Sequence, residues 1–225
     1  HIIFLKLNRL AIAWHLLNLR NFFMKTKIIL ACAVAAALAA GTANAQFYGI
    51  LGLGNTNPDS DNGILAGGDA SVDDAWAFTG GVGYRFTPSI FADLNTGISD
   101  FSHTVNIASL GNVASLDQRP VTLSFSYQFF TDKTFRPYLT AGYGWNVVSG
   151  EKTEGALAGL GIDVDNGSGF VWGAGADVFI NESWFIRGDI KQMDFDADVN
   201  VETIGNVGTA NVDPWLFNFS VGYQF

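Results

Sequence analysis

The last eleven residues alternate between bulky apolar side chains and a second set that is small or polar apart from Leu216. The bulky set occupies every second position: Trp215, Phe217, Phe219, Val221, Tyr223 and Phe225. Successive side chains of a β-strand point to opposite faces of the sheet, so this period of two predicts a strand with one bulky apolar face. A chain that repeats such segments is expected to fold as an all-β protein.

The same alternation recurs after residue 46 and predicts eight strands. Their ranges are 47–54, 75–87, 90–103, 119–130, 136–149, 169–180, 184–199 and 212–225. Short turns are expected at 87–89, 131–135 and 181–183, and long loops rich in Gly, Asp and Asn at about 55–74, 104–118, 150–168 and 200–211. An even number of strands with alternating short and long connections is typical of an antiparallel, up-and-down transmembrane β-barrel.

The chemistry of the two strand faces distinguishes a membrane barrel from a soluble one. In a soluble barrel the large apolar side chains point inward and the polar set faces water. Here the second face consists of Gly, Ala, Ser and Thr with a few charges, and eight strands enclose little volume. We therefore expect the small residues inside and the bulky residues against lipid. Aromatic residues near strand ends are typical of interfacial girdles: Trp76, Phe86, Trp145, Trp184, Trp215 and Phe225.

Residues 1–45 have a different character, since they hold five of the 12 basic residues and none of the 21 acidic ones. Within them, a cationic segment that starts at Met24 precedes an apolar run from Ile28 to Ala40. The small residues Ala43-Asn44-Ala45 follow, which completes the pattern of a secretory signal peptide.

We accordingly expect three segments. Residues 24–45 are expected to be the signal peptide, cleaved after Ala45, and residues 46–225 the outer-membrane β-barrel. Residues 1–23 precede the first methionine and are expected to be non-native upstream translation.

Composition excludes several function classes. The formal net charge of −9 argues against a nucleic-acid surface, which needs a basic patch to replace counterions. The single cysteine, Cys32, lies in the expected signal peptide, so neither a disulfide scaffold nor a cysteine-ligated zinc site is available. We expect no cofactor and no metal.

A set of motifs lies between about 119 and 225. They are Phe135-Arg136-Pro137-Tyr138, Ala141-Gly142-Tyr143-Gly144, Gly173-Ala174-Gly175-Ala176-Asp177, Trp184, Met193-Asp194-Phe195-Asp196, Asp213-Pro214-Trp215-Leu216-Phe217 and Val221-Gly222-Tyr223-Gln224-Phe225. In these motifs the chain resembles the outer membrane protein W family of eight-stranded Gram-negative barrels.

The resemblance implies a location in the outer membrane and a narrow, apolar-lined conduit that passes small hydrophobic molecules across it, including sideways into the bilayer. The terminal aromatic strand resembles the signal read by the barrel-assembly machinery, here Tyr223 and Phe225. The implied partners are outer-membrane lipid and lipopolysaccharide, the assembly machinery during biogenesis and small apolar solutes, with no nucleic acid.

The short turn at 181–183 predicts which residues face each other across one hairpin. If Ile180 faces Trp184, then Asp177 faces Arg187 and Val171 faces Met193. Alternation places six charged residues inside the barrel: Arg85, Asp93, Asp177, Arg187, Asp189 and Lys191. Such charges form either a constriction that filters solutes or an ion-pair network that fills the lumen. The second is favoured because buried charges must be partnered.

The interior is also expected to hold apolar side chains: Phe91, Phe130, Phe179, Phe185, Val171, Met193, Phe195 and Leu216. They either line a conduit for apolar solutes or pack together and block the lumen, and the family resemblance favours the conduit. Val171, Met193, Phe195 and Leu216 should lie near its external mouth.

Three smaller features have ordinary explanations. Asp194, Asp196 and Asp198 lack the spacing of a calcium loop, so they either bridge divalent cations to lipopolysaccharide or form a solvated strand tip. Pro120, Pro137 and Pro214 each remove a donor from a strand ladder, and proline is expected at strand ends.

The last feature is His103, the single histidine after residue 45, which follows Ser102. Acyl chemistry needs a nucleophile and a base within hydrogen-bond reach, and no distinctive Ser–His–acid spacing is present. We expect an exposed loop histidine and no enzyme.

The sequence thus predicts a passive outer-membrane pore for small, hydrophobic solutes. The alternative is a closed barrel whose acidic loops act at the surface, as a receptor for phage or toxin, in adhesion or in envelope stability.

Overall fold

The computed structural model describes residues 47–58, 64–65, 68–108, 110–164, 166–194, 196–201, 205–211 and 213–225. These ranges contain strands and one short 3-10 helix, η1 (Gly155–Leu157). The strands are β1 (Phe47–Asn57), β2 (Ile64–Leu65), β3 (Gly68–Val72), β4 (Ala75–Arg85), β5 (Ile90–Gly97), β6 (Phe101–Ile107), β7 (Gly111–Gln128), β8 (Phe135–Thr153), β9 (Ile162–Val164), β10 (Gly167–Phe179), β11 (Trp184–Asp194), β12 (Asp196–Val201), β13 (Gly205–Asn211) and β14 (Trp215–Gln224). Within these ranges no helix has the length and apolarity to cross a bilayer.

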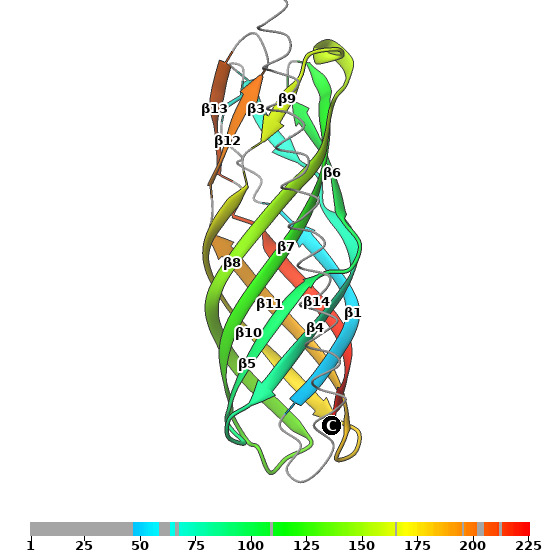
Figure 1. Ribbon diagram of the computed structural model, residues 1–225, viewed down its shortest axis with the longest axis vertical. Coiled ribbons are helices and arrows are strands. Elements are labelled where there is room, and N and C mark those ends of the chain that lie inside the picture. Colours follow the sequence, from blue (N-terminus) through cyan, green and yellow to red (C-terminus); the bar gives the residue numbers. More distant parts are fainter. Residues whose placement is uncertain are drawn as a thin grey trace, which may run out of the picture. The chain divides into compact units, whose positions relative to one another are not determined.

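Eight of the strands form a closed antiparallel barrel, which confirms the predicted fold (Figure 1). Around the ring they follow the order β1, β4, β5, β7, β8, β10, β11 and β14, and β14 pairs back with β1, where Leu51 lies opposite Val221. Closure gives every barrel strand a neighbour on both sides, so the barrel has no edge strand facing lipid.

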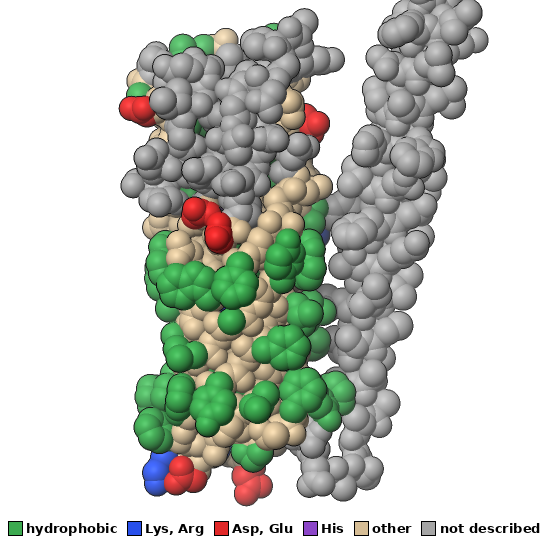
Figure 2. All heavy atoms as spheres, turned by 90° about the vertical axis from the view of Figure 1, so that its left-hand side faces the viewer, with side chains coloured by type: hydrophobic (Ala, Val, Ile, Leu, Met, Phe, Trp, Pro, Cys, Tyr) green, Lys and Arg blue, Asp and Glu red, His purple; other side chains and the backbone are tan. Residues whose placement is uncertain are grey.

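The two faces of the barrel wall have the predicted orientation. On β14, Phe219 is 63% exposed, whereas Ser220 beside it is 3% exposed. On β7 the outward residues are apolar from Val121 to Tyr127 and polar from Ser115 to Arg119. Figure 2 shows the hydrophobic side chains gathered in a band around this face, with acidic side chains beyond it at both ends. The lipid-facing surface is therefore aromatic and aliphatic.

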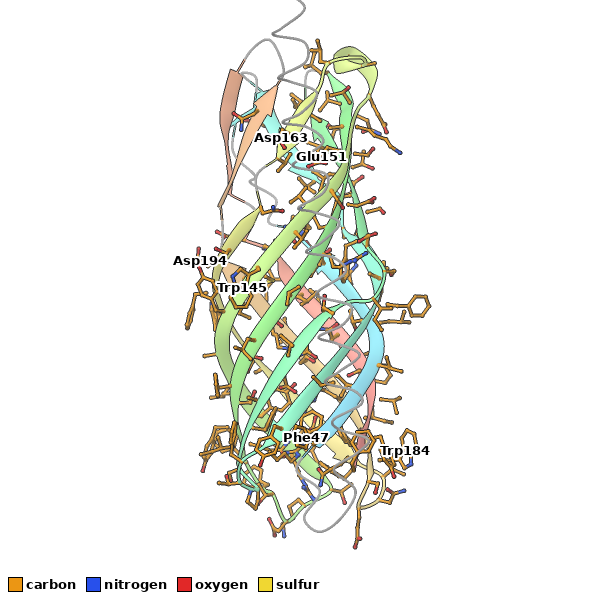
Figure 3. The ribbon with its side chains drawn as sticks, in the orientation of Figure 1. Phe47, Trp145, Glu151, Asp163, Trp184 and Asp194 are labelled. Atoms are coloured by element: carbon orange, nitrogen blue, oxygen red, sulfur yellow. The ribbon has the colours of Figure 1, made fainter. Side chains whose placement is uncertain are left out.

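The short connections 86–89, 129–134 and 180–183 lie at the same end of the barrel as the C-terminus (Figure 1). Short turns mark the periplasmic end of such barrels. Phe47 and Trp184 lie toward this end, Trp145 lies at the other border of the apolar band, and Glu151 and Asp163 lie beyond it (Figure 3). The chain thus has aromatic side chains at both membrane borders.

The prediction of long external loops was wrong in part, because strands occupy much of these segments. β6 and β7 continue past the band as a hairpin paired as far as Ile107 and Gly111, where a loop 104–118 was expected. β9 and β13 lie in segments expected to be loops, and they form a separate three-stranded sheet with β12, most of which was expected to be the end of the strand 184–199. Continued pairing satisfies the backbone donors and acceptors of these segments.

The predicted strand 90–103 is also two strands, because β5 ends at Gly97 and β6 begins at Phe101. Just past the end of β5, the amide of Ile98 still donates to Phe78 O on β4 (2.7 Å).

Candidate functional site

The periplasmic half of the lumen contains a network of buried charges. Asp177 on β10 accepts hydrogen bonds from Arg187 Nε (2.6 Å) and Nη2 (2.9 Å) on β11 and from Arg85 Nη2 (2.9 Å) on β4. Arg187 Nη1 also donates to Asp93 Oδ1 on β5 (3.0 Å), and Gln128 Nε2 on β7 donates to Asp177 (2.9 Å). The two arginines and two aspartates balance in charge. We call these five residues the polar plug.

Aromatic rings surround the polar plug. The guanidinium carbons of Arg85 and Arg187 lie 4.9 Å and 5.0 Å from the centre of the Phe91 ring, within the range of cation–π attraction. The Tyr48 hydroxyl donates a hydrogen bond to Asp93. Tyr48 has room because Gly83 faces it, and a Cβ at that position would overlap its ring. Charges, rings and glycines together fill this level of the barrel.

A second ion pair lies further from the periplasmic turn. Gly175 pairs with Asp189, and Gly173 pairs with Lys191, in the same register as Asp177 and Arg187. Lys191 Nζ lies 3.0 Å from Asp189 Oδ1, and both side chains are almost fully buried. This pair lies above the polar plug, on the side of the lumen that faces the cell exterior.

The Lys191–Asp189 pair lines a small cavity, with a volume of about 20 Å³ for water-sized molecules. Its apolar lining is made by Ile50, Phe101, Pro120 and Leu216, and its polar lining includes Asn95, Thr122, Asn218 and Ser220. Because β1, β5, β6, β7, β11 and β14 all contribute, the cavity is a product of barrel closure.

Apolar side chains fill the lumen beyond the cavity. Val171 (0% exposed) and Met193 (2%) face each other across β10 and β11. They belong to a buried cluster made with the external hairpins: Ala70, Val105, Ile107, Val113, Ala114, Leu116, Val171 and Met193. Leu216 packs nearby with Ala75, Ala77 and Phe101 in a second cluster. We call these two clusters the apolar vestibule.

The barrel wall is interrupted beside the cavity. The β5–β7 ladder ends at the pair Thr96–Val121, and the β6–β7 ladder begins at Phe101–Gln118. Pro120 lies inside β7, so the expectation of a strand-end proline was wrong for this residue. We call the segment 97–100 and its neighbours Arg119 and Pro120 the wall interruption.

At position 120, a residue other than proline would direct its backbone amide toward β5. Gln128 N donates to Ser89 O next to β5 (2.7 Å), and alternate residues of a strand turn their amides to the same neighbour. Position 120 shares this parity, and no register shift separates it from Gln128 in the β7–β8 ladder. Proline therefore removes a hydrogen bond from the side of β7 that faces β5.

The predicted interior residues divide into four groups. Val171, Met193 and Leu216 lie in the apolar vestibule. Phe91, Phe179 and Phe185 lie instead around the polar plug, where Phe179 and Phe185 stack with ring centres 5.2 Å apart.

Phe130 is a correction, and Phe195 lies outside the described residues. Phe130 is 65% exposed, because β7 ends at Gln128 and a φ of 51° at Phe130 breaks the alternation.

Several residues of the site were not identified from the sequence. Tyr48, Gln128 and Tyr138 belong to the packing around the plug, and Phe101 lines the cavity. Interior parity could have identified Gln128 and Tyr138, because both alternate with lipid-facing rings. No local signal places Phe101, since it follows the break between β5 and β6.

His103 is buried at 1% exposure, so the expected exposed histidine was wrong. Its Nδ1 donates to Asp73 O (2.6 Å), and its Nε2 accepts from Thr56 Oγ1 (3.1 Å). Burial lowers the pKa of His103 below its ordinary value. Ser102 lies on the opposite, exposed face, and its hydroxyl donates to Asp117 (2.6 Å). The geometry therefore separates the serine from the histidine.

The acidic trio on the external side is only partly described. Asp194 is exposed at the end of β11, whereas the side chains of Asp196 and Asp198 lie outside the described part of the structure. Among the described residues, no group of three or more His, Cys, Asp or Glu side chains is arranged to hold a metal.

Comparison with known proteins agrees with this geometry. The profile of the family described as outer membrane protein beta-barrel domain matches residues 28–225. Outer membrane protein W of Escherichia coli is 29% identical over 148 residues, which cover 63% of this chain and 69% of the relative. An uncharacterized outer-membrane protein of Sinorhizobium fredii is 29% identical over 182 residues, 78% of each chain.

A solved structure has the same fold. The outer membrane protein OprG of Pseudomonas aeruginosa superposes with a TM-score of 0.68 at 24% sequence identity, covering 80% of this chain and 96% of OprG. The predicted resemblance to outer membrane protein W and the predicted outer-membrane location are therefore confirmed.

Proposed function

Because this chain belongs to the outer membrane protein beta-barrel domain family, we propose that its barrel is a passive route by which small hydrophobic solutes cross the outer membrane. In this proposal no residue performs chemistry. The observation that carries it is the position of the cavity, which lies between the apolar vestibule and the wall interruption, above the polar plug.

The polar plug argues against an aqueous axial pore. The side chains of Arg187 and Asp177 are 1% and 0% exposed, and their ion pair joins β11 to β10. The bond from Arg187 to Asp93 connects a third strand, β5. Opening a path through this level would leave buried charges without partners, which is costly. A solute in the cavity would therefore leave sideways, between β5 and β7, rather than through the periplasmic end.

The apolar vestibule supports a hydrophobic solute. Val171, Met193 and Leu216 offer no hydrogen bonds, so a hydrated solute would lose water contacts without replacement when it passes them. An apolar solute loses nothing in this way and gains by leaving water. At the wall interruption such a solute would meet the acyl chains of the bilayer.

The test is uptake of n-octane by Gram-negative cells that carry an intracellular octane-oxidising enzyme and lack other outer-membrane routes for alkanes. Cells with the wild-type barrel should oxidise octane faster than cells without it. The double variant Met193→Asp/Leu216→Asp should reduce this gain, because two carboxylates in the vestibule repel apolar solutes.

The matched control places the same charges outside the lumen. Leu110 and Leu160 are exposed on the external side, at 42% and 36%, so Leu110→Asp/Leu160→Asp should leave octane oxidation unchanged. If the folded wild-type barrel gave no gain over empty cells, the transport proposal would be wrong.

A surface role is the second candidate function, and the polar plug favours it because it closes the lumen. The external sheet of β9, β12 and β13 extends beyond the membrane band, and Asp163 and Asp194 are exposed there. These features are compatible with binding of phage, toxin, host surface or cation-bridged lipopolysaccharide. Absence of octane uptake together with altered phage sensitivity or adhesion would favour this function.

We also propose that the barrel-assembly machinery reads the terminal strand. Tyr223 packs edge-on against Trp184 and Phe225, with ring centres 4.9 and 5.2 Å away, at the periplasmic end. Deleting Phe225 should lower insertion in cells and leave refolding into synthetic bilayers unchanged. Equal loss in both assays would assign Phe225 to stability instead.

A further inference from the structure

The apolar vestibule is closed to the outside in this structure. Val171 is 0% exposed and Met193 is 2% exposed, although both lie in the external half of the lumen. A solute that reaches them from the cell exterior must therefore pass between strands that separate. Separation is easiest where it breaks the fewest backbone hydrogen bonds, because each buried donor or acceptor that loses its partner costs free energy.

Backbone ladders join most neighbouring strands at the external end. β3 pairs with β6, β6 with β7, and β7 with β8 as far as the pair Ala114–Thr153. β9 pairs with β12, and β12 pairs with β13. β8 and β9 also lie against each other (Figure 1), but the described part of the structure contains no ladder between them. We call this boundary, between residues 147–153 of β8 and β9, the seam.

The seam begins where β10 leaves β8. The β8–β10 ladder ends at the pair Asn146–Gly167, whereas β8 continues to Thr153. Between β8 and β10 the chain turns through η1 and forms β9, which pairs with β12 rather than with β8. The external end of β8 therefore pairs with a strand on its β7 side and lacks a ladder on its β9 side.

Two side-chain hydrogen bonds join β8 to the residues that flank β9. Val148 N donates to Asn166 Oδ1 (2.8 Å), and Thr153 Oγ1 donates to Leu160 O (2.7 Å). Asn166 is exposed, so water can take over its hydrogen bond when the strands separate. The seam can thus open without breaking a backbone ladder.

The inner side of the seam is apolar and continuous with the apolar vestibule. Val148 on β8 and Ile162 and Val164 on β9 pack against the buried cluster of the vestibule, and each of the three is half-buried. When β8 and β9 separate, these side chains form an apolar path from the external face to the vestibule. An apolar solute replaces the contacts that they lose, whereas a hydrated solute does not.

We propose that the seam is the external entrance to the apolar vestibule and that the Asn166 side chain is its latch. Apolar solutes enter between Val148 and the β9 residues Ile162 and Val164. The inference rests on the proposed function, since it places the entrance of the same route.

The first experiment measures opening of the seam without transport. Cys32 lies in the expected signal peptide, so Val171→Cys places the one thiol of residues 46–225 in the vestibule. Mass spectrometry follows the modification of this thiol by N-ethylmaleimide, with the barrel in lipid vesicles. Adding Asn166→Ala should raise the modification rate about fivefold, as expected for the loss of one neutral hydrogen bond.

Asn181→Ala is the matched control for this experiment. Asn181 is also exposed, and its side-chain oxygen also accepts a backbone amide at 2.8 Å, from Trp184 in a periplasmic turn. This variant should leave the modification rate unchanged, and heat-modifiable gel migration verifies that each barrel is folded. An Asn166→Ala barrel that is modified no faster than the Asn181→Ala barrel would overturn the proposal.

The second experiment locks the seam and does not depend on the Asn166 variant. The two hydrogen bonds across the seam run in opposite order along the chain, so counting between them places Asp163 beside Glu151. Both residues lie beyond the apolar band (Figure 3). The cysteines of Glu151→Cys/Asp163→Cys can be joined by bis-methanethiosulfonate reagents of increasing length. Cross-linking should abolish octane uptake by the cells described above, and reduction should restore it.

Asn106→Cys/Asn112→Cys is the matched control for the lock. These residues lie opposite each other in the β6–β7 ladder, which backbone hydrogen bonds already hold together, so cross-linking them should leave uptake unchanged. Full octane uptake by a barrel that is locked at the seam would overturn the proposal. Entry between β2 and β13, which also meet without a ladder among the described residues, would give that result.

The two experiments separate this inference from the proposed function. If Asn166→Ala speeds modification of Val171→Cys but cells with the wild-type barrel gain no octane uptake, the proposed function is wrong although the seam opens. If uptake persists in the locked barrel, the entrance is wrong and the proposed function stands.

Discussion

Arg187 donates two parallel hydrogen bonds to Asp177 inside the barrel, from Nε to Oδ1 (2.6 Å) and from Nη2 to Oδ2 (2.9 Å). This bidentate pair joins β10 to β11, and the third bond of Arg187, to Asp93, reaches β5 across the lumen. One side chain thus connects two sides of the barrel, which explains why the periplasmic half is closed.

Replacing Arg187 by methionine should destabilise the barrel by about 3–5 kcal/mol, because two buried carboxylates lose a partner. Urea unfolding of the barrel in lipid vesicles measures this free energy. The control is Arg119→Met at the half-exposed Arg119–Asp100 pair (2.6 Å), where the change should stay below about 1 kcal/mol. Equal effects for both variants would show that the polar plug contributes no more than a surface pair.

Phe219 tests the orientation of the wall, since it is 63% exposed on the lipid face near the middle of β14. An arginine at the bilayer midplane of such a barrel costs about 2–4 kcal/mol, and one near the interface about 0–1 kcal/mol. Phe219→Arg should therefore lower the free energy of unfolding in vesicles much more than Tyr223→Arg at the periplasmic border. If Phe219 faced the lumen, the loss of unfolding free energy caused by Phe219→Arg would not depend on the lipid.

Pro120 tests the sideways route. Pro120→Val restores an amide donor directed toward β5 and should close part of the wall interruption, so octane uptake should fall while folding is retained. Slow exchange of the new backbone amide at position 120 would confirm the restored bond. Pro137→Val, near the periplasmic start of β8, is the control and should leave uptake unchanged. Full uptake by a Pro120→Val barrel with a protected amide would exclude this exit.

The burial of His103 predicts that the stability of its contact on the external side depends on pH. Burial lowers its pKa, which outweighs the opposing effect of Asp73, Asp74 and Asp117. The folded state therefore favours the neutral ring, and a locally opened state takes up a proton near the ordinary value of about 6.5. The stability of this contact should be fully present above that value and decrease as the pH falls below it.

Amide exchange of β6, corrected for the intrinsic pH dependence, provides the measurement. Protection of residues 101–107 should decrease between about pH 7.5 and pH 5, on either side of the ordinary histidine pKa. His103→Asn should remove this dependence, since asparagine does not titrate. Constant protection in the wild-type barrel would mean that His103 remains neutral or stays packed when protonated.

Part of the site could be predicted because it depends on local geometry. The turn at 181–183 sets the register of one hairpin, and the pairs Asp177–Arg187 and Val171–Met193 follow from it by counting. The prediction for Phe130 was wrong because it continued the inward–outward alternation of β7 past Gln128, its last paired residue. His103 was assigned to a loop because small residues weaken the alternation between 104 and 118.

Contacts across the lumen could not be predicted in the same way. Tyr48, Asp93 and Gln128 come from three different strands, and they meet at one level only after the ring has closed. The wall interruption likewise depends on two ladders that stop at different residues of β7.

The amino-acid sequence alone determined that this chain forms strands with bulky rings toward lipid and small residues and charges inside. It could do so because side-chain direction alternates with every residue, which is a property of the local backbone. Only the tertiary structure decided where the lumen is plugged, where an amphipathic cavity remains and where the wall lacks a bond. Those features depend on the relative registers of strands that are distant in sequence, and barrel closure sets these registers as a whole.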